Sequence, residues 1–287
     1  MTDVSSIETT RRVSDYYNKS HRLYRWFYID KVSLGIHYGF WGGTSSKSEA
    51  TTNQYREVAR LLKPVQGDLI LDSGCGIGGA SLWLADNTPA KYIGITISDA
   101  HLRDATRYKL QGQNGHKTRF YRMNYFNMGF PDETFNKAFG IESVCHSYPD
   151  PCQLFSELHR VLKPGGRLVM SDGILSRQPS NSFEQKLADN FCKGFCMAGW
   201  CTVNEVLMAL QKSGFVNIKF IDKTNEIRGT VRELYRTGIL TLPLHFFRLL
   251  GLVSKQEAHN TLAVLAQKKM YDLGLFGYGI FYAEKDK

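Results

Sequence analysis

The chain has 287 residues, 43% of them hydrophobic and 13% aromatic, which is enough to bury one elaborated domain or two small ones. Its net charge of +9 comes from 36 basic and 27 acidic residues without a Lys/Arg block of the kind that binds nucleic acid, so we expect a solvated basic surface or, second, an anionic small-molecule partner. Residues 1–15 lack a signal-peptide pattern and the apolar stretch 239–252 is too short to span a bilayer, so we expect a cytoplasmic protein without a transmembrane segment.

From about residue 55, apolar runs of strand length alternate with amphipathic segments of helix length. Strands are expected at 69–72, 91–97, 118–123, 136–142, 167–171, 217–222 and 277–284, and helices at 79–86, 100–113, 150–162 and 203–212. Lys163-Pro-Gly-Gly166 ends the helix 150–162 and turns the chain into the next strand. This alternation predicts an α/β fold with a doubly wound parallel sheet.

Three segments fall outside the alternation: the aromatic residues 1–54 and the stretches 174–200 and 228–275. Because open α/β sheets place their covers beyond the carboxyl ends of the strands, we expect a lid (1–54) and mainly helical caps (174–200 and 228–275) over a core (55–173, 201–227 and 276–287). Substrate contacts are expected from aromatic side chains in these covers, namely Tyr24, Trp26, Tyr38, Trp41, Phe195 and Trp200.

Cys192, Cys196 and Cys201 cluster in one cover, but their spacing matches neither a zinc knuckle nor an iron–sulfur motif. We interpret them as packing thiols and expect no metal site.

A glycine loop, Asp72-Ser-Gly-Cys-Gly-Ile-Gly-Gly79, follows the first expected strand. Gly74, Gly76 and Gly79 satisfy the GxGxxG pattern of dinucleotide-binding enzymes, which also need an acid at the end of the second strand to hold the ribose. That strand ends in GITIS, without an acid before Asp99, so a dehydrogenase is disfavoured. The alternative spacing GxGxG after an acid suits a nucleoside that carries an amino acid instead of a pyrophosphate.

Four stretches carry a resemblance to class I S-adenosylmethionine-dependent methyltransferases: LDSGCGIGG (71–79), GITIS (94–98), IESVCHSYPD (141–150) and LKPGGRLVMSD (162–172). Within that class the chain resembles the group of sterol C-methyltransferases and tocopherol methyltransferases, and more distantly phosphoethanolamine N-methyltransferases and cyclopropane fatty acid synthases. The resemblance implies a Rossmann-like seven-stranded sheet whose last strand is antiparallel, and S-adenosylmethionine as cofactor.

The resemblance also implies roles for individual residues. Gly74, Cys75 and Gly76 would pass beneath the methionine moiety, and His101 takes the place of a Gln that relatives use near the ribose. Asn124 stands where many relatives have an Asp for the adenine amino group. The cofactor contacts implied by the resemblance are Tyr16, Asp72, Gly74, Cys75, Gly76, Ile97, Ser98, His101, Asn124 and Tyr125.

Glu142 and His146 follow the fourth expected strand, at the edge of the sheet where ligands bind, and are our candidates for the chemistry. His146 is a suitable base near neutral pH, paired with Tyr16 or Tyr17 as in the phosphoethanolamine relatives. We therefore predict His146, Glu142 and Tyr17 as catalytic residues.

The aromatic covers favour a hydrophobic acceptor of isoprenoid or polycyclic type, methylated at an alkene carbon through a carbocation that is then deprotonated. Arg228, Arg232, Arg236 and Arg248 could hold a diphosphate or face water. Two alternatives stay open: N- or O-methylation of an alkaloid, amine or phenol, and a catalytically degenerate cofactor-binding regulatory subunit. A homo-oligomer is compatible with the sequence.

Overall fold

The computed structural model describes residues 4–27, 29–242 and 255–287, with side chains in 10–21, 29–242 and 258–287. Within these ranges seven strands form one sheet in the order β3-β2-β1-β4-β5-β7-β6. The strands are β1 (Leu69–Asp72), β2 (Lys91–Thr96), β3 (Thr118–Arg122), β4 (Phe135–Ile141), β5 (Leu162–Leu175), β6 (Phe215–Asp222) and β7 (Phe276–Lys285). The first five are parallel, whereas β7 runs antiparallel to β5 and β6. The predicted fold class is confirmed.

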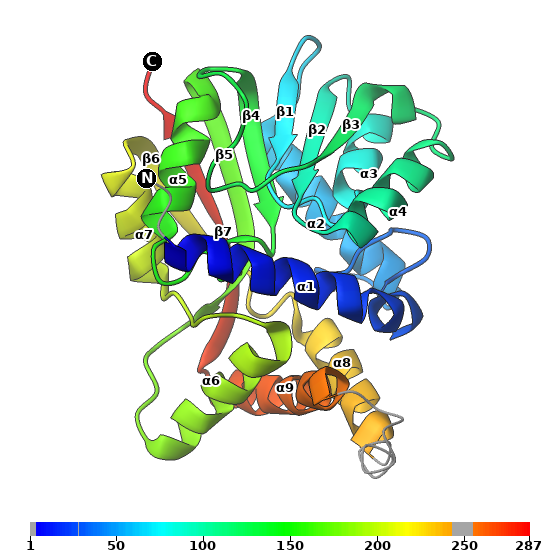
Figure 1. Cartoon of the computed structure of the whole chain (residues 1–287), viewed down its shortest axis with the longest axis vertical. Helices are drawn as coiled ribbons and strands as arrows, with labels where there is room; N and C mark the ends of the chain where they lie inside the picture. The colour runs from blue at the N-terminus through cyan, green and yellow to red at the C-terminus, as the bar shows by residue number, and fades with distance from the viewer. Residues whose placement is uncertain (1–3, 28, 243–254) are drawn as a thin grey trace.

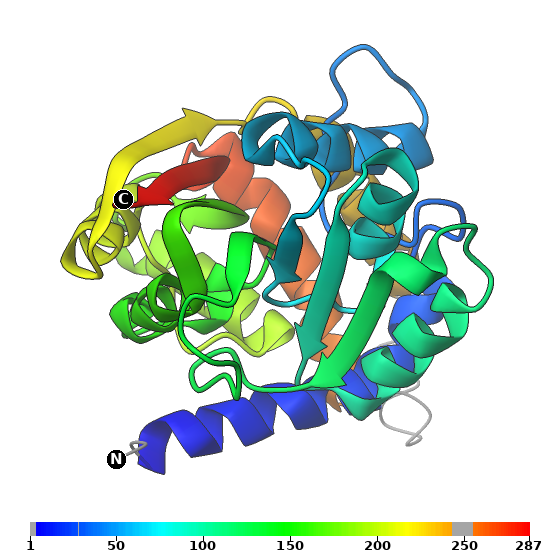
Figure 2. The same ribbon diagram turned by 90° about the horizontal axis from the view of Figure 1, so that it is seen from above.

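Helices cover both faces of the sheet, and each face has its own apolar core (Figure 2). One core includes α2 (Lys47–Leu62) and α3 (Gly79–Asn87), and the other includes α5 (Pro151–Val161) and α7 (Val203–Lys212). Asp150 caps α5 and Pro151 occupies its first turn, as both residue types favour. The apolar stripe expected on this helix is fully buried: Leu154, Phe155, Leu158 and Val161. α4 (Asp99–Lys109) packs against β2 and β3.

β5 is longer than the expected strand 167–171. It lies between β4 and β7 and pairs with both strands. The backbone N–H and C=O groups near both ends of β5 therefore find hydrogen-bond partners. Beyond Ser171, where pairing with β4 stops, β5 continues along β7 as far as Leu175. This extension carries the chain from the sheet into the cap.

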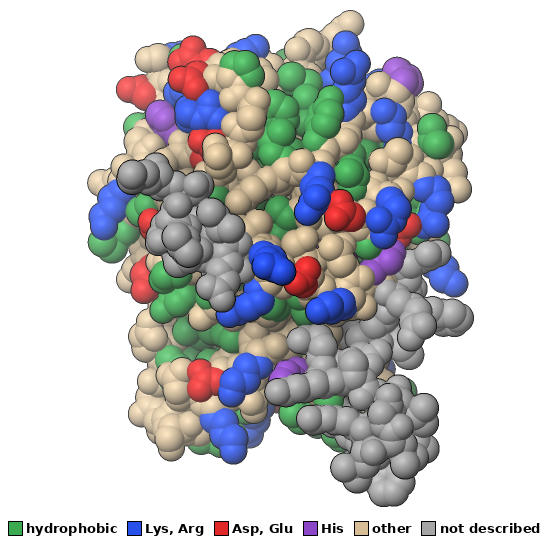
Figure 3. Space-filling view, in the orientation of Figure 1, with side chains coloured by type: hydrophobic (Ala, Val, Ile, Leu, Met, Phe, Trp, Pro, Cys, Tyr) green, Lys and Arg blue, Asp and Glu red, His purple; other side chains and the backbone are tan. Residues whose placement is uncertain are grey.

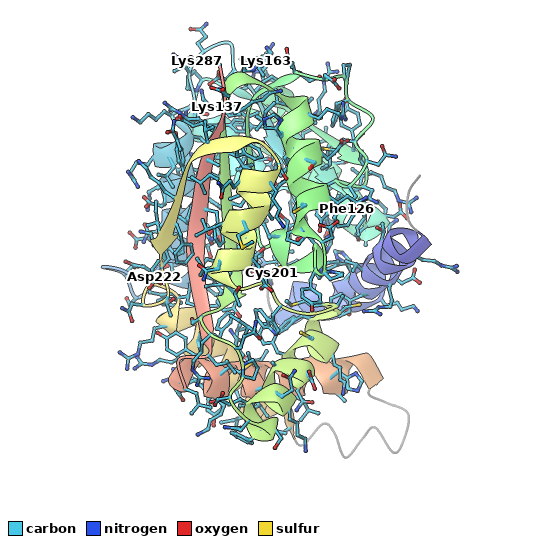
Figure 4. All side chains as sticks on the ribbon, turned by 90° about the vertical axis from the view of Figure 1, so that its left-hand side faces the viewer. Phe126, Lys137, Lys163, Cys201, Asp222 and Lys287 are labelled. Carbon is cyan, nitrogen blue, oxygen red and sulfur yellow. The ribbon has the colours of Figure 1, made fainter. Side chains whose placement is uncertain are left out.

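Three helices lie beyond the carboxyl ends of the parallel strands: α6 (Ser182–Phe195), α8 (Arg228–Thr241) and α9 (Lys255–Asp272) (Figure 1). α9 packs against both α6 and α8, so segments far apart in sequence build one cap. Residues 243–254 of the expected cap 228–275 lie outside the described part. Figure 4 shows Cys201 and Phe126 toward this end of the sheet and Lys137, Lys163 and Lys287 at the opposite end.

α1 (Val4–Phe27) crosses the carboxyl ends of the strands as one long helix (Figure 1). Its inner side buries Val13, Tyr16 and Ser20. Its outer side is exposed and basic through Arg11, Arg12 and Lys19, and Lys and Arg side chains gather there in Figure 3. The expected lid range 1–54 thus holds α1, a loop and the start of α2. None of the described helices has the length and apolarity that crossing a bilayer needs.

Candidate active site

The glycine loop turns the chain from β1 into α3 and is held closely by its neighbours. A Cβ on Gly74, where φ is +153°, would lie 2.6 Å from Cβ of Ser143 in the loop after β4. The Cys75 N–H donates to the carbonyl of Ile95 on β2, 2.9 Å away. Glycine at position 74 therefore lets the loop pack closely against the chain that follows β4.

A cavity extends from this loop to the cap. Its first end, where the sequence predicts that the nucleoside binds and which we call the nucleoside end, is formed by residues at or after the ends of β1, β2 and β3, namely Asp72, Gly74, Cys75, Gly76, Thr96, Ile97, His101, Asn124, Tyr125 and Phe126. Its other end is apolar and aromatic: Phe191, Phe195, Met197, Trp200, Leu234 and Phe276. α1 contributes Thr10, Val13 and Tyr17, and the loop before α2 contributes Tyr38. Sheet, lid and cap all contribute to the cavity wall.

Hydrogen bonds attach α1 to the nucleoside end of the cavity. The Ser14 hydroxyl donates to the carbonyl of Ile97 at 2.9 Å. The Asn18 side-chain oxygen accepts from the Ser98 hydroxyl (2.8 Å) and from the Ala100 N–H (3.1 Å), at the start of α4. Because a helix brings every third or fourth residue to the same side, these contacts lie on one stripe of α1.

Two further contacts extend that stripe. Asn124 donates from its side-chain nitrogen to the Thr10 hydroxyl at 3.2 Å. His21 Nε2 and Asp104 Oδ2 are 3.0 Å apart, which joins α1 to α4 a second time. α1 is thus fixed along its length to the elements that line the nucleoside end.

Tyr17 and His146 both line the cavity and contact each other. Tyr17 Oη and His146 Nε2 are hydrogen-bonded at 2.9 Å, which joins α1 to the short helix η2 (Val144–His146) after β4. Burial lowers the pKa of His146 to about 4, so the imidazole is neutral at pH 7. Its Nδ1 is buried without a hydrogen-bond partner among the described residues. A neutral histidine in this place can accept a proton.

Glu142 lines the same cavity and has an unusual backbone conformation. Its φ is +53°, a left-handed value that costs a non-glycine residue free energy and is often found at functional sites. Its Oε1 accepts hydrogen bonds from the Tyr38 N–H (2.7 Å) and the Tyr278 hydroxyl (3.0 Å). Burial raises the pKa of Glu142 to about 8, and nearby positive charge would favour its ionised form.

Two aspartates add to the acidic character of the cavity. Burial raises the pKa of both Asp72 and Asp172 to about 7. Asp72 accepts from the Ser81 hydroxyl at 2.7 Å, whereas Asp172 accepts from the N–H groups of Cys145 (3.0 Å) and Gly173 (2.7 Å). Three buried carboxyl groups, with Glu142, therefore face one cavity, an arrangement suited to a positively charged ligand.

The cavity brings together most of the residues expected from the sequence: Tyr17, Tyr38, Asp72, Gly74, Cys75, Gly76, Ile97, His101, Asn124, Tyr125, Glu142, His146, Phe195 and Trp200. The expected pairing of His146 with a tyrosine is present and uses Tyr17.

Three expected residues are not part of the cavity lining. Tyr16 points instead toward α9, where its hydroxyl accepts from the Asn260 side chain at 3.2 Å. Ser98 caps α4 and gives its hydroxyl proton to Asn18, so it is engaged with the lid. The Trp41 indole N–H donates to the Thr230 hydroxyl at 2.8 Å and joins the loop before α2 to α8. Tyr24 and Trp26 belong to α1, but their side chains lie outside the described residues.

Several lining residues were not expected. Asp172 follows the apolar run of β5, and the same rule that selected Glu142, an acid at the end of a strand, could have found it. Phe191, Leu234 and Phe276 line the apolar end from three different elements. No local pattern distinguishes them from ordinary core residues, because only the packing of α6, α8 and β7 places them together.

Residues 71–170 match a family model described as a methyltransferase domain. This stretch of the chain is a methyltransferase domain, and the chain is similar to methyltransferases along most of its length. Its relatives support this. It is 28% identical to methyltransferase GfsG of Streptomyces halstedii over 96% of this chain and 95% of the relative. It is 27% identical to the chloroplastic tocopherol O-methyltransferase of Arabidopsis thaliana (98% and 84% covered). It is 28% identical to a sterol 24-C-methyltransferase of Eremothecium gossypii, of which the match covers 56%, and 71% of this chain.

Solved structures share the fold of this methyltransferase. The [4+2]-cyclase SpnF superposes with a TM-score of 0.77 at 22% identity, covering 96% of this chain and 95% of that one. Geranyl diphosphate C-methyltransferase from Streptomyces coelicolor, solved with geranyl diphosphate and S-adenosylhomocysteine, gives a TM-score of 0.71 at 21% identity (96% and 97% covered). The predicted cofactor is confirmed, and the backbone-lined glycine loop beside buried carboxyl groups suits a sulfonium nucleoside.

Proposed function

We propose that this methyltransferase methylates an alkene carbon of an uncharged, hydrophobic acceptor of isoprenoid or polycyclic type. The observation that carries the proposal is that the buried Glu142 lines the same cavity as the glycine loop and the aromatic side chains of the cap. In this proposal, residues 1–54 provide the lid over the cofactor and residues 228–275 provide the main acceptor cap.

The aromatic end of the cavity supports an acceptor that becomes positively charged. Trp200 and Phe276 stand in edge contact with ring centroids 5.7 Å apart, and Phe191 packs against both. The faces of aromatic rings attract cations, and a buried carboxylate adds a formal opposite charge. Such surroundings stabilise a carbocation more than its neutral alkene precursor, which is what lowers the barrier.

The chain's own residues can complete the reaction. The bound cofactor supplies a methyl group that is activated by positive sulfur. The alkene π electrons would form the new carbon–carbon bond while the methyl–sulfur bond breaks and leaves its electron pair on sulfur, so that positive charge remains on the acceptor beside Glu142. The neutral His146, hydrogen-bonded to Tyr17, accepts a proton from the adjacent carbon, and the released electron pair forms the new double bond. Closure by α1 keeps water from the cation.

Charge in the cavity supports an uncharged acceptor over a diphosphate. Lys47 is the one Lys or Arg among the described lining residues, and it interacts with Glu233 of α8. Arg228, Arg232 and Arg236 are exposed and do not line the cavity, and Arg248 lies outside the described residues. An anion would instead face the carboxyl groups of Asp72, Glu142 and Asp172.

Transfer of a labelled methyl group tests the proposal. The purified protein is incubated with methyl-labelled S-adenosylmethionine and one acceptor class per reaction: sterols, polyprenyl hydrocarbons, prenyl diphosphates, hydrophobic amines or phenols. Mass spectrometry then identifies the products and the methylated atom. Carbon methylation of an uncharged acceptor is expected. Methylation confined to nitrogen or oxygen would support the first alternative, and label confined to diphosphates would overturn the uncharged class. Cofactor binding without transfer to any acceptor would favour the regulatory subunit.

The cytoplasmic location and the homo-oligomer stay predictions. Fractionation of the producing cells and light scattering of the purified chain would check them.

A further inference from the structure

Glu142 is held from outside the cavity by a buried group of polar side chains. The Tyr278 hydroxyl of β7 donates to Glu142 Oε1 at 3.0 Å. The side-chain nitrogen of Gln54, on α2, donates to the Tyr278 oxygen at 2.7 Å and to the Ser171 hydroxyl at 2.8 Å. Gln54 and Tyr278 are fully buried, and neither lines the cavity.

This arrangement directs the proton of the Tyr278 hydroxyl. A tyrosine hydroxyl has a single proton to donate and can accept through its lone pairs. Because Gln54 donates to the Tyr278 oxygen, the hydroxyl proton is left for Glu142. The Tyr38 N–H reaches the same carboxylate oxygen at 2.7 Å. Oε1 is thus bonded twice, whereas Oε2 accepts no hydrogen bond from the described residues and is left to the cavity.

We propose that Tyr278 and Gln54 are positioning residues that orient the Glu142 carboxylate, so that its second oxygen faces the positive charge of the methyl-transfer reaction. The inference rests on the role proposed above for Glu142. It adds two residues that act through Glu142 and that touch neither cofactor nor acceptor.

The surroundings of Glu142 show why this support is needed. The titratable groups around it are Asp172 on β5, Cys145 in η2, Tyr55 on α2, Tyr38 and Tyr278. Burial and the charge of Asp172 raise the pKa of Glu142, whereas the hydrogen bonds from Tyr38 and Tyr278 lower it. Loss of the Tyr278 hydroxyl should therefore raise this pKa further and leave less carboxylate at neutral pH.

Cofactor charge gives a readout that does not depend on the acceptor. Calorimetry would compare S-adenosylmethionine, a sulfonium cation, with S-adenosylhomocysteine, its neutral thioether, from about pH 6 to pH 9. Tyr278→Phe should weaken binding of the sulfonium about fivefold at neutral pH, leave the thioether nearly unchanged, and shift the rise in sulfonium affinity to higher pH. Tyr282→Phe is the matched control, because its hydroxyl bonds Glu284 on the same strand, away from the cavity.

A double-variant cycle separates positioning from general support of the fold. In a Glu142→Gln background, Tyr278→Phe should no longer change the preference for sulfonium over thioether. The inference would be overturned if Tyr278→Phe weakened the binding of both ligands equally, caused no pH shift, and had its full effect again in the Glu142→Gln background. If Tyr278→Phe does not fold, Gln54→Met removes the donor behind Tyr278 and is measured in the same way. An acceptor screen that finds another substrate class leaves these binding results untouched.

Discussion

The two ends of the cavity are built by different means. The nucleoside end is formed largely by backbone and short side chains at the carboxyl ends of adjacent strands, as at Gly74 and Ile97. The aromatic end, where we propose that the acceptor binds and which we call the acceptor end, is formed by large side chains that come from the cap and from β7, such as Phe195 and Phe276. A cofactor site set by sheet geometry can stay constant while the cap changes, so one fold can serve many acceptors.

Gly74→Ala should break the nucleoside end and give the largest effect. The added Cβ would lie 2.6 Å from Cβ of Ser143, and a loop displaced by about 1 Å costs on the order of 100-fold. We expect affinity for S-adenosylhomocysteine to fall by about that factor in calorimetry. Gly129→Ala is the control, because a Cβ there meets only Met123 Cε, at 3.9 Å. Unchanged affinity in Gly74→Ala would show that the glycine loop does not hold the cofactor.

Glu142→Gln should separate chemistry from binding. The amide keeps the shape of the side chain but removes the charge beside the developing cation, which typically costs about 100-fold in turnover. Affinity for S-adenosylhomocysteine should change little, because the neutral thioether does not need the carboxylate. Turnover with the identified acceptor and calorimetry measure the two effects. Glu226→Gln, away from the cavity, controls for loss of a carboxylate, and a variant rate equal to wild type would remove Glu142 from the mechanism.

The nucleoside end could be predicted from sequence because its residues follow strands and the loop motif is local. Asp72, Gly74, Ile97 and Asn124 all reach the cavity as expected. Local patterns also explain why Ser98 is not part of the cavity lining. Ser98 is the N-cap of α4, and its hydroxyl accepts a hydrogen bond from the His101 N–H, as serine in that position favours.

The remainder of the site depends on contacts between distant segments. Glu142 is held by Tyr38 and Tyr278, which are 104 and 136 residues away in sequence. Helix phase explains another difference, since successive residues of a helix point about 100° apart. Tyr16 and Tyr17 therefore cannot share a target, and Tyr17 reaches His146 while Tyr16 reaches Asn260.

Phe195→Ala should affect only the acceptor end. Removing a large apolar side chain from a hydrophobic contact weakens binding by about 10-fold. We expect the acceptor KM to rise by that factor while the affinity for S-adenosylmethionine stays unchanged. Phe183→Ala, on the same helix but 54% exposed, is the matched control. A loss of cofactor affinity in Phe195→Ala would contradict the separation of the two ends.

Asn18→Ala tests whether α1 belongs to the nucleoside end. The Asn18 oxygen accepts from Ser98 and from Ala100, and losing one such attachment costs about 1 kcal/mol, or about fivefold in affinity. Cofactor affinity should fall while the acceptor KM is retained. The exposed neighbour Lys19→Ala provides the control. If the acceptor KM rises instead, the lid serves mainly the acceptor end.

The pH dependence of stability probes Glu142 without any ligand. Its pKa is raised from 4.5 to about 8 in the fold, so its contribution to stability is fully present below about pH 4.5 and is lost as the pH rises through about 8. The melting temperature of the wild type should therefore fall relative to Glu142→Gln, by a few degrees, between about pH 5 and pH 9. The buried aspartates and histidines are common to both proteins and largely cancel. Saturating S-adenosylmethionine should flatten the difference, because the sulfonium favours the ionised carboxylate. A melting-temperature difference that does not vary with pH would mean that Glu142 has an ordinary pKa in the fold. Another residue would then have to supply the negative charge that we propose for the cavity.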